Sequence, residues 1–264
     1  GEIVWKNQEL RFAPGHGQGG SPVLAGGLLV FHCDGTDRQS VAALDAATGK
    51  LRWQTPRRDG AMAYTTPLVI EVAGKQQVIS PGANRAASYD LETGEELWSI
   101  RYGGFSNVPR PVFAHGLVFV TSGYYNPVLY AVRPGGRGDV TDTHVVWSSR
   151  RGIPLTPSPL IVGEELYIVS DKGIASCLNA KTGAQNWRAR LKGQYSASPL
   201  YADGRIYFQN EDGLYTVIEP GLEFKKLAEN QVDGRTFASL APADGGFFLR
   251  TSTHLYRIEE REKR

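Results

Sequence analysis

The stretch Asp45-Ala-Ala-Thr-Gly-Lys-Leu-Arg-Trp53 decides the fold, because its pattern returns along the chain. Asp90-Leu-Glu-Thr-Gly-Glu-Glu-Leu-Trp98 repeats it, and Asn179-Ala-Lys-Thr-Gly-Ala-Gln-Asn-Trp187 repeats it with Asn for Asp. Gly1-Glu-Ile-Val-Trp5 carries the end of the pattern, and Trp147 closes an expanded copy. All five tryptophans therefore occupy one repeat position.

A second marker, usually Ser-Pro or Thr-Pro, precedes each unit. It begins at Ser21, Thr66, Arg110, Ser158, Ser198 and Ser239, with spacings of 45, 44, 48, 40 and 41 residues. One four-stranded propeller blade takes about 40–50 residues. Short apolar runs and Gly-containing turns fill each interval, and no long stretch shows helical periodicity. The sequence predicts an all-β protein, a β-propeller of four-stranded antiparallel blades with six blade repeats and essentially no helix.

We expect one domain over residues 1–264. Residues 1–20 are predicted to supply a closing strand and a loop, with Glu2–Trp5 as a lone fourth strand that could complete the sixth blade. The blades are predicted at about 21–55, 66–100, 110–149, 158–191, 198–230 and 239–260.

The repeated residues are interpreted as structural, because a residue that recurs in every unit is poor evidence for a unique active site. The Asp carboxylate and the Thr hydroxyl suit hydrogen bonds within a turn, and a large Trp can pack over the Thr-Gly turn of a neighbouring blade. The structural set comprises Trp5, Trp53, Trp98, Trp147, Trp187, Gly49, Gly94 and Gly183.

These repeats resemble the PQQ-like (pyrroloquinoline-quinone-like) β-propeller repeat family, including its BamB-like members, over nearly the whole chain. Val4–Arg11 and Gly116–Val120 add a closer likeness to uncharacterised secreted PQQ-like repeat proteins of planctomycete-type bacteria. The family holds PQQ-dependent dehydrogenases as well as non-enzymatic propellers such as the BamB-like lipoprotein of outer-membrane barrel assembly. The resemblance implies a periplasmic or secreted location. Because members usually have eight blades, it also suggests a fragment that lacks about two upstream blades.

Composition excludes several classes of function. The formal net charge of +2 argues against a broad basic footprint for nucleic acid. Apolar runs such as Leu28–Phe31 are far shorter than the ~20 residues that span a bilayer. Cys33 and Cys177 are too far apart in sequence for a CxxC pair, and no two histidines have the i, i+4 spacing of metal ligands. We expect no metal site, no catalytic cluster, no nucleic-acid partner and a monomer.

PQQ is disfavoured as a cofactor. In the PQQ dehydrogenases that the family includes, the quinone needs a stacking Trp, a calcium ion held by acidic and amide side chains, and often a disulfide between adjacent cysteines. Every Trp here belongs to the repeat, and Cys33 and Cys177 are not adjacent. We therefore predict no cofactor, with PQQ and calcium as the disfavoured alternative.

Departures from the repeat point to a binding surface at the funnel face of the propeller. Arg110 replaces the Ser or Thr that most blades place before Pro, and Tyr124-Tyr125-Asn126 replaces a short polar turn. A guanidinium beside aromatic rings could clamp an anionic or sugar-like ligand, or it could form a salt bridge that fills the axial hole. The predicted ligand- or partner-binding residues are Arg110, Arg85, Asn107, Tyr64, Tyr125 and Tyr195.

Two functions follow from these patterns. The first is a non-enzymatic binding or scaffold propeller of the bacterial cell envelope, which holds a protein partner or a small ligand at the funnel face. The alternative is a PQQ-dependent dehydrogenase-like or other enzyme that uses the central funnel.

Overall fold

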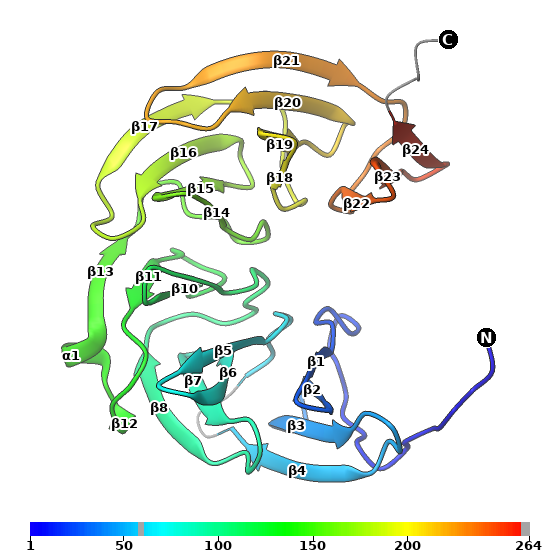
Figure 1. Ribbon diagram of the computed structural model, residues 1–264, viewed down its shortest axis with the longest axis vertical. Coiled ribbons are helices and arrows are strands. Elements are labelled where there is room, and N and C mark those ends of the chain that lie inside the picture. Colours follow the sequence, from blue (N-terminus) through cyan, green and yellow to red (C-terminus); the bar gives the residue numbers. More distant parts are fainter. Residues whose placement is uncertain (58–60, 260–264) are drawn as a thin grey trace. The chain divides into compact units, whose positions relative to one another are not determined.

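The computed structural model describes residues 1–57 and 61–259, and strands dominate them (Figure 1). Backbone contacts divide the chain into two compact units, Gly1–Arg151 and Gly152–Arg264. No helix in the described residues is long and apolar enough to cross a membrane.

The first unit contains three sheets, each with four antiparallel strands. The first sheet consists of β1 (Val23–Ala25), β2 (Leu28–Asp34), β3 (Gln39–Asp45) and β4 (Leu51–Pro56). The second consists of β5 (Leu68–Val72), β6 (Lys75–Pro81), β7 (Arg85–Asp90) and β8 (Glu96–Arg101). The second sheet has a fifth strand, β12 (Gly138–Asp139), that pairs in parallel with β8. The third consists of β9 (Val112–Ala114), β10 (Leu117–Thr121), β11 (Leu129–Val132) and β13 (Val145–Ser149).

The second unit contains two four-stranded sheets and a three-stranded one among its described residues. The first four-stranded sheet consists of β14 (Leu160–Val162), β15 (Glu165–Val169), β16 (Ile174–Asn179) and β17 (Gln185–Arg190). The second consists of β18 (Leu200–Ala202), β19 (Arg205–Gln209), β20 (Leu214–Glu219) and β21 (Lys225–Gln231). The last sheet is β22 (Ala241–Ala243), β23 (Gly246–Arg250) and β24 (Leu255–Glu259). The predicted all-β class and the four-stranded antiparallel blades are confirmed.

One local prediction is wrong. Glu2–Trp5 forms no strand, because it pairs with no other strand in the described part of the chain. The expanded turn of the third blade holds one short helical turn, α1 (Thr141–His144). It follows β12 (Gly138–Asp139), which pairs in parallel with β8. The Asp139 carboxylate accepts hydrogen bonds from the amide and the hydroxyl of Thr141 and so fixes the start of this turn.

Trp5 and Trp53 pack on the Thr-Gly turn of the blade that follows them, as predicted. The Trp53 indole donates to the carbonyl oxygen of Leu91 at 2.9 Å, and its ring covers Gly94 so closely that a methyl group there would lie 2.5 Å from it. Trp5 covers Gly49 in the same way and donates to the carbonyl oxygen of Ala46 at 2.9 Å. Thus Trp5 takes the expected place although its strand does not form.

Strand register explains why a small residue precedes each Asp. Ala43 pairs with Trp53, Ser88 with Trp98, Ala131 with Trp147 and Cys177 with Trp187. A β-bulge follows each of these pairs, which bends the strand at the indole. The small side chain leaves room for the ring on the same face of the sheet.

The Asp and Thr of the motif hold the turn, as predicted. One carboxylate oxygen of Asp45 accepts from the amide of Ala47, and from the amide and hydroxyl of Thr48 at 2.9 and 2.8 Å. Asp90 and Asn179 make the same set of bonds. An amide oxygen serves as well as a carboxylate there, which explains why Asn replaces Asp in the fourth blade.

Candidate functional site

The loops at one end of the first three blades are joined by main-chain hydrogen bonds. Thr36 donates to the carbonyl oxygen of Ala13 at 2.8 Å, Ser106 to Met62 at 2.9 Å and Asn84 to Gly104 at 2.8 Å. Tyr64 donates to Asn107 at 2.7 Å, and Tyr124 to Phe105 at 2.7 Å. We call this surface the loop face; it comprises residues 12–20, 35–38, 61–66, 82–84, 102–107 and 122–127 of the first unit. Its loops hold one another in fixed positions.

The loops before β9 and before β11 approach each other through glycines. Gly104 lies against the carbonyl of Ser122, where a methyl group would come within 2.1 Å of the oxygen. Gly123 lies in the same way against Phe105 and Asn107. Both glycines also have positive φ, +139° and +81°, so other residues are excluded by backbone conformation as well as by space. This close approach brings the side chains of both loops together.

Three aromatic rings meet where these loops join. Tyr124 and Tyr125 have ring centroids 4.6 Å apart, and Phe105 lies 6.0 Å from Tyr124 and 5.6 Å from Tyr125. The side chains nevertheless stay open to solvent, with exposed fractions of 36% for Phe105, 46% for Tyr124 and 69% for Tyr125. We call Phe105, Tyr124 and Tyr125 the aromatic trio. Exposed rings grouped on an ordered surface are typical of a contact site.

A hollow of about 390 Å³ adjoins the trio. Arg150, just after β13, lines it and is exposed. The lining residues are Gly103, Gly104, Phe105, Tyr124, Tyr125, Asn126, Val128, Tyr130 and Arg150. The volume falls within the range of small-ligand and side-chain pockets. We call it the aromatic hollow.

The loop that carries the tyrosines has an unusual backbone. Tyr125 and Asn126 are consecutive residues in the left-handed region, with φ of +59° and +56°. This conformation costs about 1 kcal/mol or more for a residue with a side chain, and such residues cluster at ligand sites. The surrounding hydrogen bonds therefore hold the Tyr125 ring outward at an energetic cost to the loop.

Two of the six predicted binding residues present side chains on the loop face. Tyr125 belongs to the aromatic trio, and Tyr64 is half-buried, with its ring 6.1 Å from that of His16. Asn107 lies within the same surface but is buried. Its side-chain amide donates to the Tyr102 hydroxyl at 3.1 Å and to the Thr121 carbonyl at 2.8 Å. Asn107 therefore supports the loops from below.

The other three residues occupy different positions. Arg85 is buried in β7, and its guanidinium pairs with Glu96 on β8, along the blade rather than on the loops. Arg110 is exposed just before β9, but it does not line the aromatic hollow; Arg150 does. Tyr195, in the second unit, is fully buried in the core between its blades. That these six residues form one binding surface remains a prediction.

A buried charged cluster lies beneath the loop face. It was not predicted from the sequence. Arg57, after β4, forms an ion pair with Asp34 at 3.1 Å and donates to the Ser80 carbonyl at 3.2 Å. Its guanidinium also contacts the Ser80 hydroxyl and Nδ1 of His32. Burial first, and then the charge of Arg57, lower the pKa of His32. A neutral His32 can accept from Arg57 at Nδ1, so the cluster holds one cation and one carboxylate.

This cluster contains Ser, His and Asp but lacks the geometry of a nucleophile relay. Ser80 and Asp34 both contact Nδ1 of His32, at 3.4 and 3.3 Å. A catalytic imidazole needs the hydroxyl on one ring nitrogen and the carboxylate on the other. Nε2 of His32 is buried without a hydrogen-bond partner among the described residues. The arrangement therefore joins β2, β4 and β6 rather than activating Ser80.

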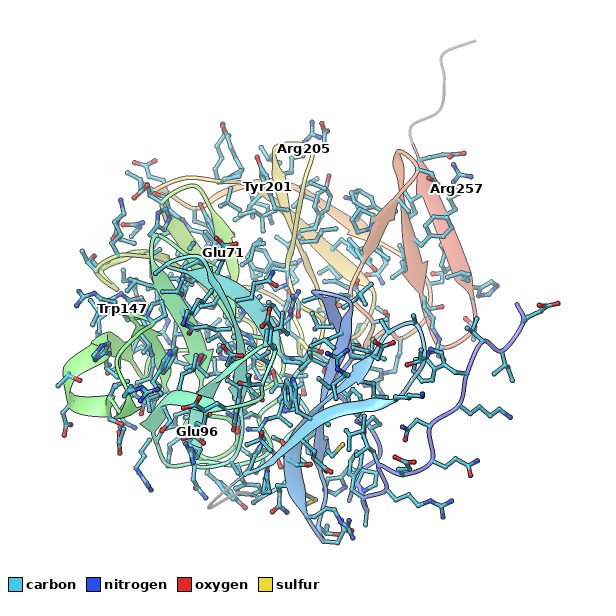
Figure 2. All side chains as sticks on the ribbon, turned by 60° about the horizontal axis from the view of Figure 1, so that its bottom comes forward. Glu71, Glu96, Trp147, Tyr201, Arg205 and Arg257 are labelled. Carbon is cyan, nitrogen blue, oxygen red and sulfur yellow. The ribbon has the colours of Figure 1, made fainter. Side chains whose placement is uncertain are left out.

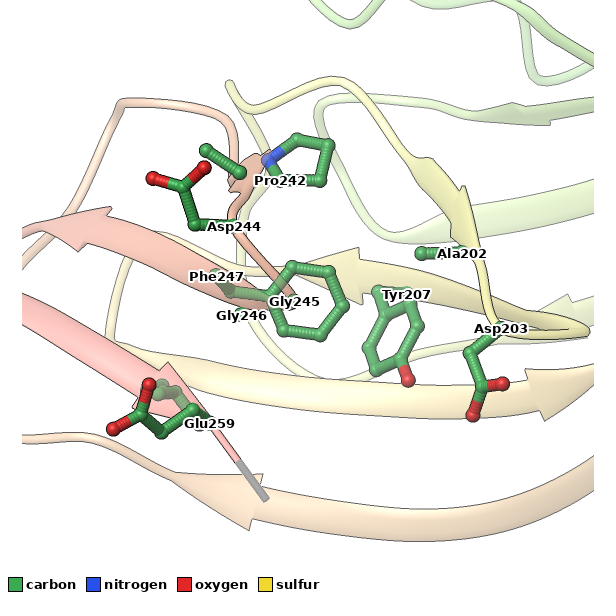
Figure 3. Close-up of a pocket in the computed structure, with 11 residues that line it drawn as sticks. Ala202, Asp203, Tyr207, Pro242, Asp244, Gly245, Gly246, Phe247 and Glu259 are labelled. Carbon is green, nitrogen blue, oxygen red and sulfur yellow. The ribbon is translucent and has the colours of Figure 1, made fainter. Parts of the chain in front are cut away.

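The second unit has a larger hollow of about 710 Å³ at the tight turns of its last two blades. Figure 3 shows the rings of Tyr207 and Phe247 next to each other in it, and their centroids are 5.1 Å apart. Asp203, on its rim, is paired with Arg205. Here the two rings pack edge to face on each other, and of the acidic lining residues Asp203 and Glu259 are paired with Arg205 and Arg257.

The residues needed for a quinone are otherwise engaged. Trp53 and Trp5 cover turns, Trp187 donates to Gly221 at 3.0 Å, Trp98 donates to Gln77 at 3.1 Å, and Trp147 packs on Phe119. No three His, Cys, Asp or Glu side chains gather as a metal-ligand group within residues 1–57 and 61–259. That the chain binds no PQQ and no calcium remains a prediction.

Repeated four-stranded blades, locked by a tryptophan on the next turn, define a β-propeller of PQQ-like repeats. The chain matches the profile of the family described as outer membrane protein assembly factor BamB, at residues 1–142 and 137–222. The chain belongs to this family, and the predicted resemblance is confirmed.

Individual relatives bear different names. BamB of Alkalilimnicola ehrlichii is 28% identical over 155 residues, which cover 56% of this chain and 39% of that protein. Tetrathionate hydrolase of Acidithiobacillus ferrooxidans is 26% identical over 190 residues, which cover 64% of this chain and 35% of the enzyme. The chain thus spans less than two fifths of each of these relatives.

Solved structures share the fold at low identity. BamB of Moraxella catarrhalis superposes with a TM-score of 0.67 at 14% identity, over 90% of this chain and 70% of that one. Quinohemoprotein alcohol dehydrogenase of Comamonas testosteroni gives a TM-score of 0.61 at 14% identity, over 84% of this chain and 44% of the enzyme. Both similarities concern the fold alone.

Proposed function

We propose that this chain is a non-enzymatic binding propeller of the bacterial cell envelope, and that it holds a protein partner on its loop face. The observation that carries the proposal is the aromatic trio, three solvent-exposed rings on loops fixed by main-chain hydrogen bonds. Rigid, exposed tyrosines provide large contact area at low cost in conformational entropy. The envelope location rests on the family, whose printed description is an outer-membrane assembly factor.

The enzymatic alternative has support only from the names of two relatives, a hydrolase and a dehydrogenase. The buried His32, Asp34 and Ser80 are not arranged as a relay, and the tryptophans are engaged in blade packing. We therefore assign binding, rather than chemistry, to the loop face.

Site-specific photo-crosslinking tests the proposal. A benzoylphenylalanine replaces Tyr124 in the full-length natural protein in its own cells, and the matched control replaces Tyr201 on β18 (Figure 2). Tyr201 is 44% exposed and Tyr124 46%, so the two probes meet solvent equally. We expect a discrete protein adduct in the envelope fraction for position 124 alone. Equal yields at both positions, or no adduct at 124, would contradict the proposal.

A ligand titration tests the alternative. A molecule that binds only the folded state raises the melting temperature by mass action. PQQ with Ca²⁺ is expected to leave the melting temperature unchanged. A rise that saturates with PQQ concentration would restore the dehydrogenase-like function.

A further inference from the structure

We propose that the aromatic hollow binds an extended, acidic, proline-containing peptide segment. This inference rests on the proposed function and names the chemistry of the partner at that site.

Proline fits the shape and chemistry of the aromatic trio. The hollow of about 390 Å³ is lined by the three rings of the trio and by Gly103 and Gly104, which have no side chains to fill it. Aromatic-lined grooves recognise proline-rich segments in the polyproline II conformation, because that helix is already extended and loses little entropy on binding.

Polar groups at the rim suit a peptide backbone. Polyproline II carbonyl groups have no internal hydrogen bonds and need donors from a partner. The hydroxyls of Tyr124 and Tyr125 have no hydrogen-bond partner in the described part of the chain, and the Asn126 side chain is exposed beside them. The lining holds one amide and one charged side chain besides its tyrosines, so its rings and its polar groups suit a peptide backbone, and a glycan is the alternative that the test includes.

Charge selects an acidic segment. Arg150 is the charged residue of the lining, and no Asp or Glu belongs to it. Within residues 1–57 and 61–259, Arg150 forms no ion pair. A guanidinium at the edge of a partly apolar hollow pairs well with a carboxylate, through two parallel hydrogen bonds. A Glu or Asp one or two residues from the proline would reach it.

The test uses a fluorescein-labelled peptide with three repeats of Pro-Pro-Glu, and anisotropy measures its binding to the intact chain. Peptides with three repeats of Pro-Pro-Lys and of Gly-Gly-Glu remove the charge match and the proline separately. Chitotriose serves as the glycan probe. We expect saturable binding of the Pro-Pro-Glu peptide and at least roughly tenfold weaker binding of the others.

Two variants locate the binding on the protein. Tyr125→Gly removes a ring of the trio and relieves its positive φ, so the protein should melt no lower than wild type while its peptide affinity falls roughly tenfold. Arg150→Gln should lower affinity for Pro-Pro-Glu and flatten its dependence on salt. The controls are Tyr201→Ala and Arg190→Gln, exposed residues of the second unit that should leave affinity unchanged.

The outcomes separate the ligand class from the function. Equal affinity for the Lys and Glu peptides, binding of chitotriose instead, or full affinity in Tyr125→Gly overturns the acidic-peptide inference. A crosslinked partner at position 124 would still uphold the binding function in that case. The function itself is rejected by the crosslinking experiment, if position 124 gives no adduct or gives no more than position 201.

Discussion

Trp53 of the first blade covers Gly94 of the second, and its indole N–H donates to the carbonyl oxygen of Leu91 at 2.9 Å. The ring is buried, although it belongs to the fourth strand of its own blade. The contact needs a turn with no side chain at position 94, so the indole and the glycine depend on each other. The stability of the first two blades is therefore coupled through this pair.

Replacing Trp53 tests the coupling. Trp53→Ala is expected to cost about 3–5 kcal/mol of unfolding free energy, because a buried aromatic ring leaves a cavity. Trp53→Phe keeps much of the apolar contact but loses the hydrogen bond to Leu91, so it should cost less. Urea denaturation measures both variants, and a loss near zero for Ala would show that the ring does not hold the blades.

Replacing Gly94 tests the other half of the pair. Gly94→Ala must adopt a φ of +73° and must displace the Trp53 ring. Gly74→Ala is the matched control, since Gly74 has a φ of +75° and no atom within 4 Å of the added methyl group. The control should lose about 1 kcal/mol from backbone strain alone, and Gly94→Ala clearly more. Equal losses in urea melts would mean that the ring yields freely.

The acid sensitivity of the first blade should depend on Asp45. Hydrogen bonds from the Thr48 hydroxyl and then the Thr48 amide lower the pKa of Asp45. A carboxylate with a depressed native pKa contributes stability above the unfolded pKa of about 3.9, and the contribution is lost as the pH falls through the native value. Asp45→Asn, which copies Asn179, should therefore lose less stability between pH 5 and pH 3 than wild type does. Parallel curves for the two proteins would contradict this assignment.

His32 should destabilise the protein in mild acid. Burial and the nearby charge of Arg57 lower the pKa of His32 from 6.5, so the native state keeps it neutral where the unfolded chain takes up a proton. The free energy of unfolding should thus fall as the pH drops below about 6.5. His32→Gln, which can still accept from Arg57, should show a shallower fall between pH 7.5 and pH 5. An unchanged slope would show that the pKa of His32 is the same in the folded and unfolded states, and would contradict this prediction.

Much of the fold could be predicted because the repeat is built from local chemistry. The turn bonds of Asp45 and the Trp53–Gly94 contact recur at a fixed period, and such a pattern is visible in one sequence. The predicted strand at Glu2–Trp5 was wrong because a strand needs a pairing partner, and a local sequence pattern does not show whether one is present. The helical turn at Thr141–His144 falls in the expanded turn, where the repeat gives no template.

The candidate site was predicted only in part. Tyr124 and Tyr125 could be found in the sequence because their turn departs from the repeat. Arg150 was missed because it follows a fourth strand without any anomaly in the sequence. Arg85 was predicted on the loop between the second and third strands, but it is the first residue of β7 and its side chain pairs with Glu96. Neither the end of a loop nor the direction of a side chain can be known before the packing of the blade. The His32 and Arg57 cluster joins distant segments, so no single motif marks it.

Packing of an indole on the turn that follows, as Trp5 and Trp53 do, also bears on how such chains lengthen and shorten during evolution. The first blade has a turn at Gly49 that is covered by one indole, and its fourth strand carries Trp53, which covers the turn of the next blade. Duplication or deletion of a repeat of this kind between two Ser/Thr-Pro markers therefore leaves its indole facing an equivalent turn. Recombination at these points creates no unmatched surface, so blade number can change in whole steps while the packing within the array is preserved.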